Sequence, residues 1–253
     1  MNLKLEKLRI AKVLRDAEKR SLEFLEPLEC VKKAIHDFGD SLSVSCSFGK
    51  CSVAVLHMAL QFKPDIKVVF CDTGVEYPET YDYMNLLAEK WHLNLIKTKP
   101  KKTFWECVKQ YGFPQLRSKI KKPKCCIYLK EIPFAEICKQ YGIKATLTGM
   151  RAGEAGNRMF WFSEAGQNYM VKKYALWKFN PIALWTFEDV EKYYVENNIP
   201  RNKLYEKVER SGCMPCTGFL NWEKQLARTN PKMYLYVQRL RGQTLLTECF
   251  NGA

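Results

Sequence analysis

The sequence predicts an α/β fold in which a parallel sheet is covered by helices on both faces. Short apolar runs typical of strands alternate with segments in which apolar residues recur at helical spacing. The helical segments are about a dozen residues long, as expected for connections between parallel strands. Polar or glycine-bearing clusters follow several of the predicted strands, at the edge where such sheets bind their ligands.

The expected elements begin with a helix over 3–20 and a second helix over 25–38. Pro78 opens a later helix, because proline is tolerated in the first turn. The remaining elements, in chain order, are a strand at 41–47, a helix at 52–62, a strand at 66–72, the helix from Pro78 to about Trp91, a strand at 93–98, a helix at 131–142 and a strand at 144–150.

The chain carries no internal repeat, low-complexity tract or obvious flexible linker. We therefore expect one compact unit built from three parts. A helical segment spans 1–40, and a nucleotide-binding α/β domain spans 41–205. The composition changes after about Arg201, and a C-terminal segment with a Cys-x-x-Cys motif and a tail spans 206–253.

The net charge of +14, from 41 Lys and Arg against 27 Asp and Glu, indicates an anionic partner. Ten basic residues and one acidic residue, Glu106, lie between Lys97 and Lys124. This basic segment, 97–124, is either a solvated face or a surface for a nucleotide or a nucleic acid.

No apolar run approaches the roughly 18 residues needed to cross a bilayer. The N-terminal stretch is charged on nearly every turn and lacks the apolar core of a signal peptide. We therefore expect a cytoplasmic protein with no membrane contact, and a homo-oligomer is left open.

The stretch VSCSFGKCSV, residues 44–53, places a tight polar turn between a strand and a helix. Gly49 lets backbone N–H groups approach an anion at the positive end of that helix, and Lys50 can neutralise phosphate charge. An ordinary strand-to-helix turn is the alternative. The residues that we expect to bind a nucleotide here are Ser45, Ser47, Phe48, Gly49, Lys50 and Ser52.

Two further clusters follow predicted strands, and we expect them beside the same pocket. An arginine that follows a glycine after a strand can present its guanidinium to a phosphate or a sulfate, although a surface arginine is the alternative. The first cluster is Asp72, Thr73, Gly74 and Glu76, and the second is Gly149, Arg151 and Arg158. Weaker candidates for the same anion are Arg117, Lys119 and Lys178.

Eleven cysteines are many for a protein expected in the cytoplasm, where disulfides are disfavoured. Most lie singly among apolar residues, as small buried hydrophobic side chains do. Two pairs differ: the adjacent Cys125 and Cys126, and Cys213 with Cys216. Four thiolates suit an iron–sulfur cluster or zinc, and adjacent cysteines are less suited to zinc. The cations nearest the first pair in sequence, which can offset cluster charge, are Lys122, Lys124 and Lys130.

The turn at 47–52 resembles the PP-loop of the adenine-nucleotide hydrolase-like superfamily, whose usual form is Ser-Gly-Gly-Lys-Asp-Ser. Phe48 stands where that loop has a glycine, and Cys51 stands where it has the aspartate. The aspartate is tied to Mg-ATP chemistry in that superfamily, so its replacement argues against ATP cleavage.

Five ordered blocks resemble the (phospho)adenylyl-sulfate reductase family of the same superfamily. They are DTGVEYPET from Asp72, CCIYLKEIPF from Cys125, TGMRAGEAGNR from Thr148, NPIALWTFEDVEKYYVENNIPRNKLY from Asn180 and SGCMPCT from Ser211. The resemblance implies a Rossmann-like fold, an adenine nucleotide as substrate and a [4Fe-4S] cluster. The implied cluster ligands are Cys125, Cys126, Cys213 and Cys216.

The tail LLTECFNGA resembles the C-terminal Glu-Cys-Gly-Leu/Ile-His of that family, which carries a nucleophilic cysteine. Glu248 and Cys249 match the start of the motif, whereas Phe250 and Asn251 depart from it and no histidine follows. The resemblance makes Cys249 the candidate nucleophile, and Glu248 and Arg151 are the other candidate catalytic residues. A coincidental exposed cysteine is the alternative.

We expect one of two functions. In the first, the Cys249 thiolate attacks adenylyl sulfate or its 3′-phosphorylated form, and a thioredoxin- or glutaredoxin-like dithiol then releases sulfite. In the second, a PP-loop enzyme uses ATP to transfer sulfur to a nucleic acid or a small molecule. Lys50 and Ser52 fit the ATP-cleaving loop, but Cys51 argues against it, and the five blocks favour the reductase.

Overall fold

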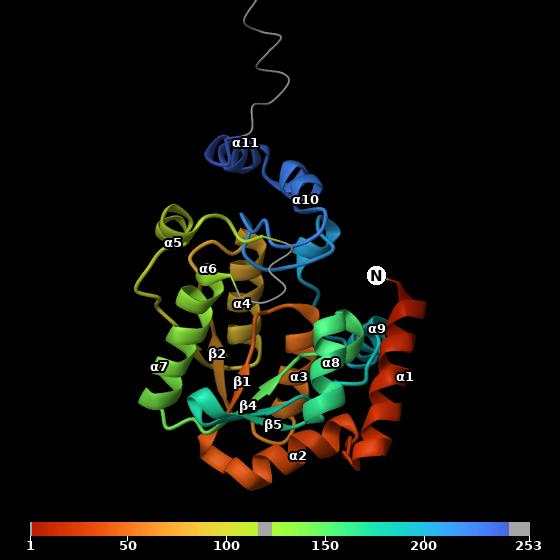
Figure 1. Ribbon diagram of the computed structural model, residues 1–253. Helices are drawn as coiled ribbons and strands as arrows, with labels where there is room; N and C mark the ends of the chain where they lie inside the picture. The colour runs from red at the N-terminus through yellow and green to blue at the C-terminus, as the bar shows by residue number, and fades with distance from the viewer. Residues whose placement is uncertain (1, 116–122, 243–253) are drawn as a thin grey trace, which may run out of the picture. The chain divides into compact units, whose positions relative to one another are not determined.

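The computed structural model describes residues 2–115 and 123–242 of the chain (Figure 1). The chain folds into two compact units. The first, which we call the sheet unit, comprises Met1–Cys71, Tyr83–Thr98 and Phe134–Asn202, and the second, the cysteine unit, comprises Asp72–Asp82, Lys99–Pro133 and Lys203–Ala253. The sequence predicts a different division, into the consecutive parts 1–40, 41–205 and 206–253. That division stays a prediction.

The sheet unit is built on six strands in the order β3-β2-β1-β4-β6-β5. Every neighbouring pair is parallel except β5 and β6, which are antiparallel at one edge. The predicted parallel α/β sheet is therefore confirmed, with one reversed edge strand. The strands are β1 (Leu42–Ser45), β2 (Lys67–Phe70), β3 (Asn94–Lys97), β4 (Ala145–Thr148), β5 (Tyr169–Val171) and β6 (Leu176–Phe179).

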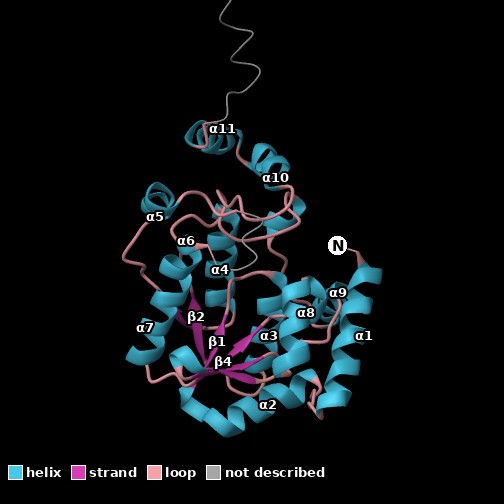
Figure 2. Cartoon of the chain, in the orientation of Figure 1, coloured by secondary structure: helices cyan, strands magenta, loops and turns pink. Residues whose placement is uncertain are grey.

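Helices flank this sheet on two sides, with α7 on one side of the strands and α3 and α8 on the other (Figures 1 and 2). The predicted helix over 3–20 has the bounds that its apolar spacing indicates. The helices are α1 (Leu3–Arg20), α2 (Pro27–Phe38), α3 (Lys50–Leu60), α4 (Pro78–Lys90), α7 (Ile132–Gln140), α8 (Gly156–Ala165) and α9 (Phe187–Glu196), and α4 and α7 each contain residues of both units. Short 3-10 turns lie at Gly39–Ser41, Ala152–Glu154 and Lys172–Tyr174.

Helix α1 is part of the core of the sheet unit. Val13 of α1 and Phe162 of α8 are fully buried in one cluster with Ala152 and Ala183. Burying side chains of this size stabilises the packing by roughly 1.5–3 kcal/mol each. The N-terminal helix is therefore held by the same apolar contacts that order the residues after β4.

Three apolar clusters hold the described part of the cysteine unit. They centre on Phe104, Cys107 and Leu129, on Trp222, Leu226 and Val237, and on Tyr77, Leu204 and Val208. Its helices are α5 (Phe104–Tyr111), α6 (Lys124–Cys126), a π-helical turn (Ile127–Glu131), a 3-10 turn (Lys203–Glu206), α10 (Trp222–Thr229) and α11 (Pro231–Leu240). None of the helices searched in the described ranges is long and apolar enough to cross a membrane.

Candidate functional site

Residues 45–52, which we call the phosphate loop, join β1 to α3 in the sheet unit. Gly49 caps α3, and the bond from Val53 N to Gly49 O, 3.0 Å long, closes its first turn. The N–H groups of a first helical turn have no acceptor within their own helix, and the helix dipole favours an anion there. The local geometry therefore supports the phosphate site that the sequence predicts.

The Ser52 hydroxyl holds the phosphate loop in shape. It donates to the Gly49 carbonyl at 2.9 Å and accepts from Ser47 N at 3.2 Å. The Ser47 hydroxyl lies 3.3 Å from the Ser52 hydroxyl. Because the Ser52 proton is already used within the loop, this serine shapes the site, and Ser47 keeps the freer hydroxyl.

Phe48 occupies the phosphate loop in an unusual backbone conformation. Its φ is 54°, in the left-handed region that glycine adopts most easily, and its side chain is fully buried. The ring packs edge-on against Phe70 of β2, with centroids 5.5 Å apart. The phenylalanine that replaces the PP-loop glycine therefore keeps a glycine-like backbone and anchors the loop on the sheet.

Replacing Phe48 with glycine is expected to lower the free energy of unfolding by roughly 3 kcal/mol. Loss of a buried aromatic ring costs about 3–5 kcal/mol, and relief of the left-handed conformation returns about 1–2 kcal/mol. Denaturant unfolding measures the difference. Phe48→Ala is the control: it loses the same ring but keeps a Cβ, so it should be about 1 kcal/mol less stable than Phe48→Gly. A glycine variant as stable as the parent would contradict the anchoring role.

Lys50 is paired with an acidic residue that the sequence did not single out. Its Nζ donates to Glu191 Oε1 at 2.6 Å, and Arg201 Nη1 donates to Glu191 Oε2 at 2.6 Å. Burial alone would raise the pKa of Glu191, but the bonds from the two cations lower it. Glu191 therefore holds two cations at the start of α3, and nothing local in the sequence signals a contact with a residue 141 positions away.

Gly149 lies directly against the phosphate loop. A Cβ on Gly149 would lie 2.6 Å from Cys51 C and 2.6 Å from Ser52 N, far inside contact distance. Only a residue without a side chain lets the end of β4 approach the first turn of α3 this closely. The structure therefore brings together the predicted residues at 45–52 and Gly149.

The two arginines after Gly149 differ in their surroundings. Arg151 is 1% exposed and donates to Cys51, Glu6 and the Trp185 carbonyl. Arg158 is partly exposed and pairs with Glu154. The expected contact of these arginines with a phosphate or sulfate stays a prediction. Of the weaker candidates, Lys178 lies on β6, and Arg117 and Lys119 lie outside the described residues.

Residues Asp72, Thr73, Gly74 and Glu76 belong to the cysteine unit. Asp72 Oδ1 accepts from Gly74 N at 2.9 Å and from the Tyr81 hydroxyl at 2.6 Å. Burial, and then the hydrogen bond to Asp72, raise the pKa of Tyr81. Asp72 therefore stabilises the turn at Gly74, whose φ of 73° suits glycine.

Glu76 lies against the cysteines. It is 7% exposed, pairs in an antiparallel bridge with Cys213, and accepts from the Thr73 hydroxyl at 2.9 Å. The Cys213 thiol lies 3.7 Å from Glu76 Oε1, and Lys130 Nζ lies 3.6 Å from the same oxygen. Glu76 and Lys130 thus form a charged pair beside Cys213 in the cysteine unit.

The four predicted ligand cysteines all lie in the cysteine unit as free thiols. The hydrogen bond that the Cys125 thiol donates to Cys126, then burial and the charges of Cys126, Cys216 and Cys213, raise the pKa of Cys125. Burial raises the pKa of Cys213 to about 12, and Lys130 opposes that rise. Burial also raises the pKa of Cys216, so Cys125, Cys213 and Cys216 need a nearby positive charge to become thiolates, as a metal centre supplies.

The four cysteines are the candidate ligands of a metal centre. Within 2–115 and 123–242, no group of three or more Cys, His, Asp or Glu side chains is arranged to hold a metal ion as it stands. The chemistry of the donor set does fit an iron–sulfur cluster, because four free thiols lie in one unit. Residues Glu248 and Cys249 lie outside the described residues.

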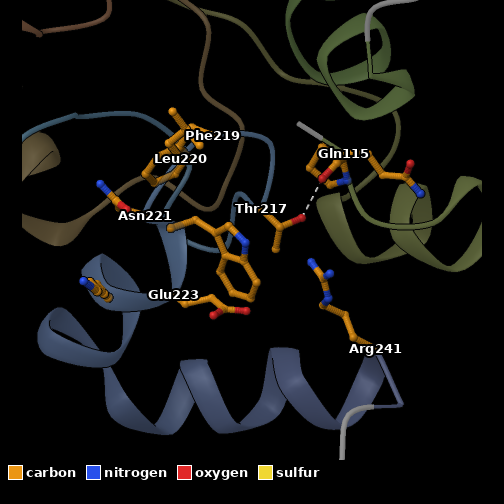
Figure 3. Close-up of a pocket in the computed structure, with 10 residues that line it drawn as sticks. Gln115, Thr217, Phe219, Leu220, Asn221, Glu223 and Arg241 are labelled. Atoms are coloured by element: carbon orange, nitrogen blue, oxygen red, sulfur yellow. Dashed lines mark hydrogen bonds between the residues drawn. The ribbon is translucent and has the colours of Figure 1, made fainter. Parts of the chain in front are cut away.

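The cysteine unit also contains a cavity of about 360 Å³, which no sequence motif predicts (Figure 3). The Thr217 hydroxyl donates to the Pro114 carbonyl at 2.7 Å on its wall, and the Arg241 guanidinium lies 5.0 Å from the Trp222 ring centre. None of the nucleotide or metal candidates lines it.

Similarity to known proteins was found at three levels. The model of the phosphoadenosine phosphosulfate reductase domain matches residues 41–219. Adenosine 5′-phosphosulfate reductase from Geobacillus kaustophilus is 32% identical over 195 residues, which cover 75% of this chain and 78% of that protein. Adenosine 5′-phosphosulfate reductase 1 from Bacillus subtilis is 31% identical over 195 residues, which cover 75% and 79%.

Solved structures agree with these matches. The crystal structure of phosphoadenylyl-sulfate reductase from Candida auris superposes with a TM-score of 0.59 at 26% identity, over 75% of this chain and 88% of that chain. A U34-tRNA thiolase from Methanococcus maripaludis, at 13% identity and a TM-score of 0.53 over 88% and 81%, shares the fold alone. With most of its sheet unit and both cysteine pairs inside the matched region, the chain belongs to the phosphoadenosine phosphosulfate reductase family.

Proposed function

We propose that this chain is a thiol-dependent sulfonucleotide reductase that converts adenylyl sulfate to AMP and sulfite. The observation that carries the proposal is the phosphate loop, closed by Gly149 against the first turn of α3 within the family-matched region. Relatives that match three quarters of the chain are named adenosine 5′-phosphosulfate reductases, which supports the non-phosphorylated nucleotide as substrate. These names do not favour ATP-dependent sulfur transfer.

In this proposal the sheet unit binds the nucleotide. The backbone N–H groups at the start of α3 donate to the 5′-phosphate, and the Ser47 hydroxyl adds a donor. Lys50, held by Glu191, supplies positive charge at the same place. Arg158 is proposed as a further contact of the anion, and nucleotide binding by Asp72, Thr73 and Gly74 stays a prediction from the sequence.

The chemistry requires a thiolate nucleophile, and we assign it to Cys249. Its sulfur attacks the sulfur of adenylyl sulfate, the bond from that sulfur to the bridging oxygen breaks, and AMP leaves with the electron pair. The product is a cysteine S-sulfonate. A thioredoxin- or glutaredoxin-like dithiol attacks the cysteine sulfur, sulfite leaves, and the second thiol of the dithiol restores Cys249 as the disulfide forms. The dithiol thus supplies both electrons.

Cys125, Cys126, Cys213 and Cys216 are the residues that would hold a [4Fe-4S] cluster. When bound, the cluster supplies fixed charge and cross-links the segments that carry its ligands, rather than turning over electrons. Lys130 balances negative charge next to Cys213, where it lowers the pKa of the thiol against the effect of burial. The cytoplasmic location and a nucleic-acid surface on the basic segment 97–124 stay predictions.

The proposal predicts a covalent adduct that mass spectrometry can detect. Anaerobically purified protein, incubated with adenylyl sulfate and no reductant, should carry one sulfonate group on the peptide that contains Cys249. The group should be released as sulfite when reduced thioredoxin is added. The adduct should be absent from Cys249→Ser, while Cys107→Ala, which changes a buried cysteine outside the predicted nucleophile and ligands, should retain it.

The outcomes separate the parts of the proposal. An adduct formed only with the 3′-phosphorylated nucleotide would change the substrate and keep the mechanism. An adduct on another cysteine would overturn the assignment of Cys249. Protein that holds iron but forms no adduct with either nucleotide would overturn the reductase function.

A further inference from the structure

We propose that Glu6 is a positioning residue that sets the geometry of the phosphate loop through Arg151. Glu6 lies on α1, before the family-matched region begins at residue 41. The inference rests on the proposed nucleotide site and adds to it a carboxylate from outside that region.

The Glu6 carboxylate is buried and both of its oxygens accept hydrogen bonds. The residue is 1% exposed, Oε1 accepts from Arg151 Nη1 at 3.2 Å, and Oε2 accepts from Phe187 N at 2.8 Å. Phe187 is the first residue of α9, so the second bond satisfies an N–H group that has no partner within that helix. A buried carboxylate with two donors of this kind is a fixed feature of the fold and not a surface charge.

Arg151 carries this contact to the phosphate loop. Its Nε donates to Cys51 Sγ at 3.2 Å, and its Nη1 also donates to the Trp185 carbonyl at 3.1 Å. Cys51 is in the first turn of α3, next to Lys50 and Ser52. A single guanidinium therefore connects α1, the residues before α9 and the loop that is proposed to bind phosphate.

Helix α1 is shaped to bring Glu6 to this position. A Cβ on Gly153 would lie 3.0 Å from Glu6 Cβ, so the helix approaches the chain at a point where glycine leaves room. Arg9 Nη1 donates to the Gly153 carbonyl at 2.8 Å, one turn further along α1. These contacts fix the position of Glu6 independently of Arg151.

The charges explain why Glu6 is needed. Among the described residues, Arg151 hydrogen-bonds two side chains, Cys51 and Glu6, and Glu6 is the one that carries a full charge. Without the Glu6 carboxylate, the buried Arg151 guanidinium would be an uncompensated charge. It would then attract the phosphate or the loop and displace them. If this is the role of Glu6, a carboxylate at position 51 should be able to take it over, since Arg151 already reaches that side chain.

The test is a double-mutant cycle read out by nucleotide binding. Calorimetric titration with AMP and with adenylyl sulfate gives Kd for the parent, Glu6→Gln, Cys51→Asp and the double variant. Glu6→Gln should weaken binding about 10- to 100-fold, because the loss of a hydrogen bond to a charged phosphate reduces affinity on that scale. Cys51→Asp alone should also weaken binding, since Arg151 then faces two carboxylates. The double variant should bind more tightly than either single variant.

Matched controls separate positioning from general destabilisation. Glu18→Gln removes an exposed carboxylate from the same helix and should leave Kd and thermal stability unchanged. Glu6→Asp keeps the charge but is one methylene shorter, so it should fold and still bind AMP more weakly. Glu6→Asp replaces Glu6→Gln in the binding measurement if Glu6→Gln does not fold.

Four results would be decisive. A double variant that binds more weakly than both single variants, or a folded Glu6→Asp with parental affinity, would overturn the role of Glu6. A parent protein that binds neither nucleotide would overturn the proposed function itself. Recovery of affinity in the double variant would establish that Glu6 acts through Arg151 on the phosphate loop.

Discussion

Replacing Gly149 with alanine is expected to weaken AMP binding by about 100-fold, because the displaced N–H groups lose hydrogen bonds to a charged phosphate. The added Cβ would lie 2.6 Å from two backbone atoms of the phosphate loop, Cys51 C and Ser52 N. Backbone atoms cannot rotate away as the end of a flexible side chain can, so the first turn of α3 must move. Overpacking of this kind lowers the free energy of unfolding by about 1–3 kcal/mol, which leaves a folded protein whose affinity can be measured by calorimetric titration.

Gly156 provides the control for this prediction. It begins α8 in the same sequence block, has no atom within 4 Å of an added Cβ, and has no positive φ. Gly156→Ala should therefore bind AMP as the parent does and be slightly more stable, because alanine favours the helix. Parental affinity in Gly149→Ala would show that the nucleotide does not use the start of α3, and the proposed site would have to be abandoned.

The sheet could be predicted from local patterns, but its far edge could not. The strand at Leu42–Ser45 and the helix at Leu3–Arg20 have clear periodicity, and both were predicted. β5 (Tyr169–Val171, YMV) and β6 (Leu176–Phe179, LWKF) were not predicted, and neither sequence is a compact aliphatic run such as that of β2. Such strands are defined by the pairing with a neighbour, which a local pattern does not contain.

One missed helix did have a local signal. Thr103 caps α5 and forms a reciprocal pair of bonds with Glu106, three residues later and before an apolar run. That spacing is a capping box and predicts a helix start. The segment was instead interpreted by its charge alone, as a solvated face or a binding surface. The helix and the charge are compatible readings of the same residues.

The candidate site was predicted in part for a similar reason. The serines, Gly49 and Lys50 of the phosphate loop share one turn, so their spacing alone indicates an anion site. Glu6 and Glu191 contact Arg151 and Lys50 across 145 and 141 residues, and each looks like an ordinary acidic residue of an amphipathic helix. Only the folded chain shows that the buried Glu6 and the partly buried Glu191 lie beside cations, because their contacts depend on how α1 and α9 pack.

Replacing Cys213 with alanine is expected to remove the iron and the acid-labile sulfide from the protein. The four cysteines come from α6 and from the Cys-x-x-Cys segment, and Cys213 is joined to Glu76 by a backbone bridge. A cluster on these ligands would cross-link segments far apart in the chain, so its loss should lower the free energy of unfolding by more than about 4 kcal/mol. Metal analysis, sulfide assay and denaturant unfolding measure these effects.

Cys107→Ala is the matched control, because Cys107 is buried in the same unit and is not a predicted ligand. It should keep its iron and lose only about 1 kcal/mol, as a small core truncation does. Full iron content in Cys213→Ala would remove Cys213 from the ligand set. Zinc in place of iron in anaerobically purified parent protein would overturn the cluster, and the fixed charge next to Lys130 and Glu76 would then belong to a tetrahedral thiolate site.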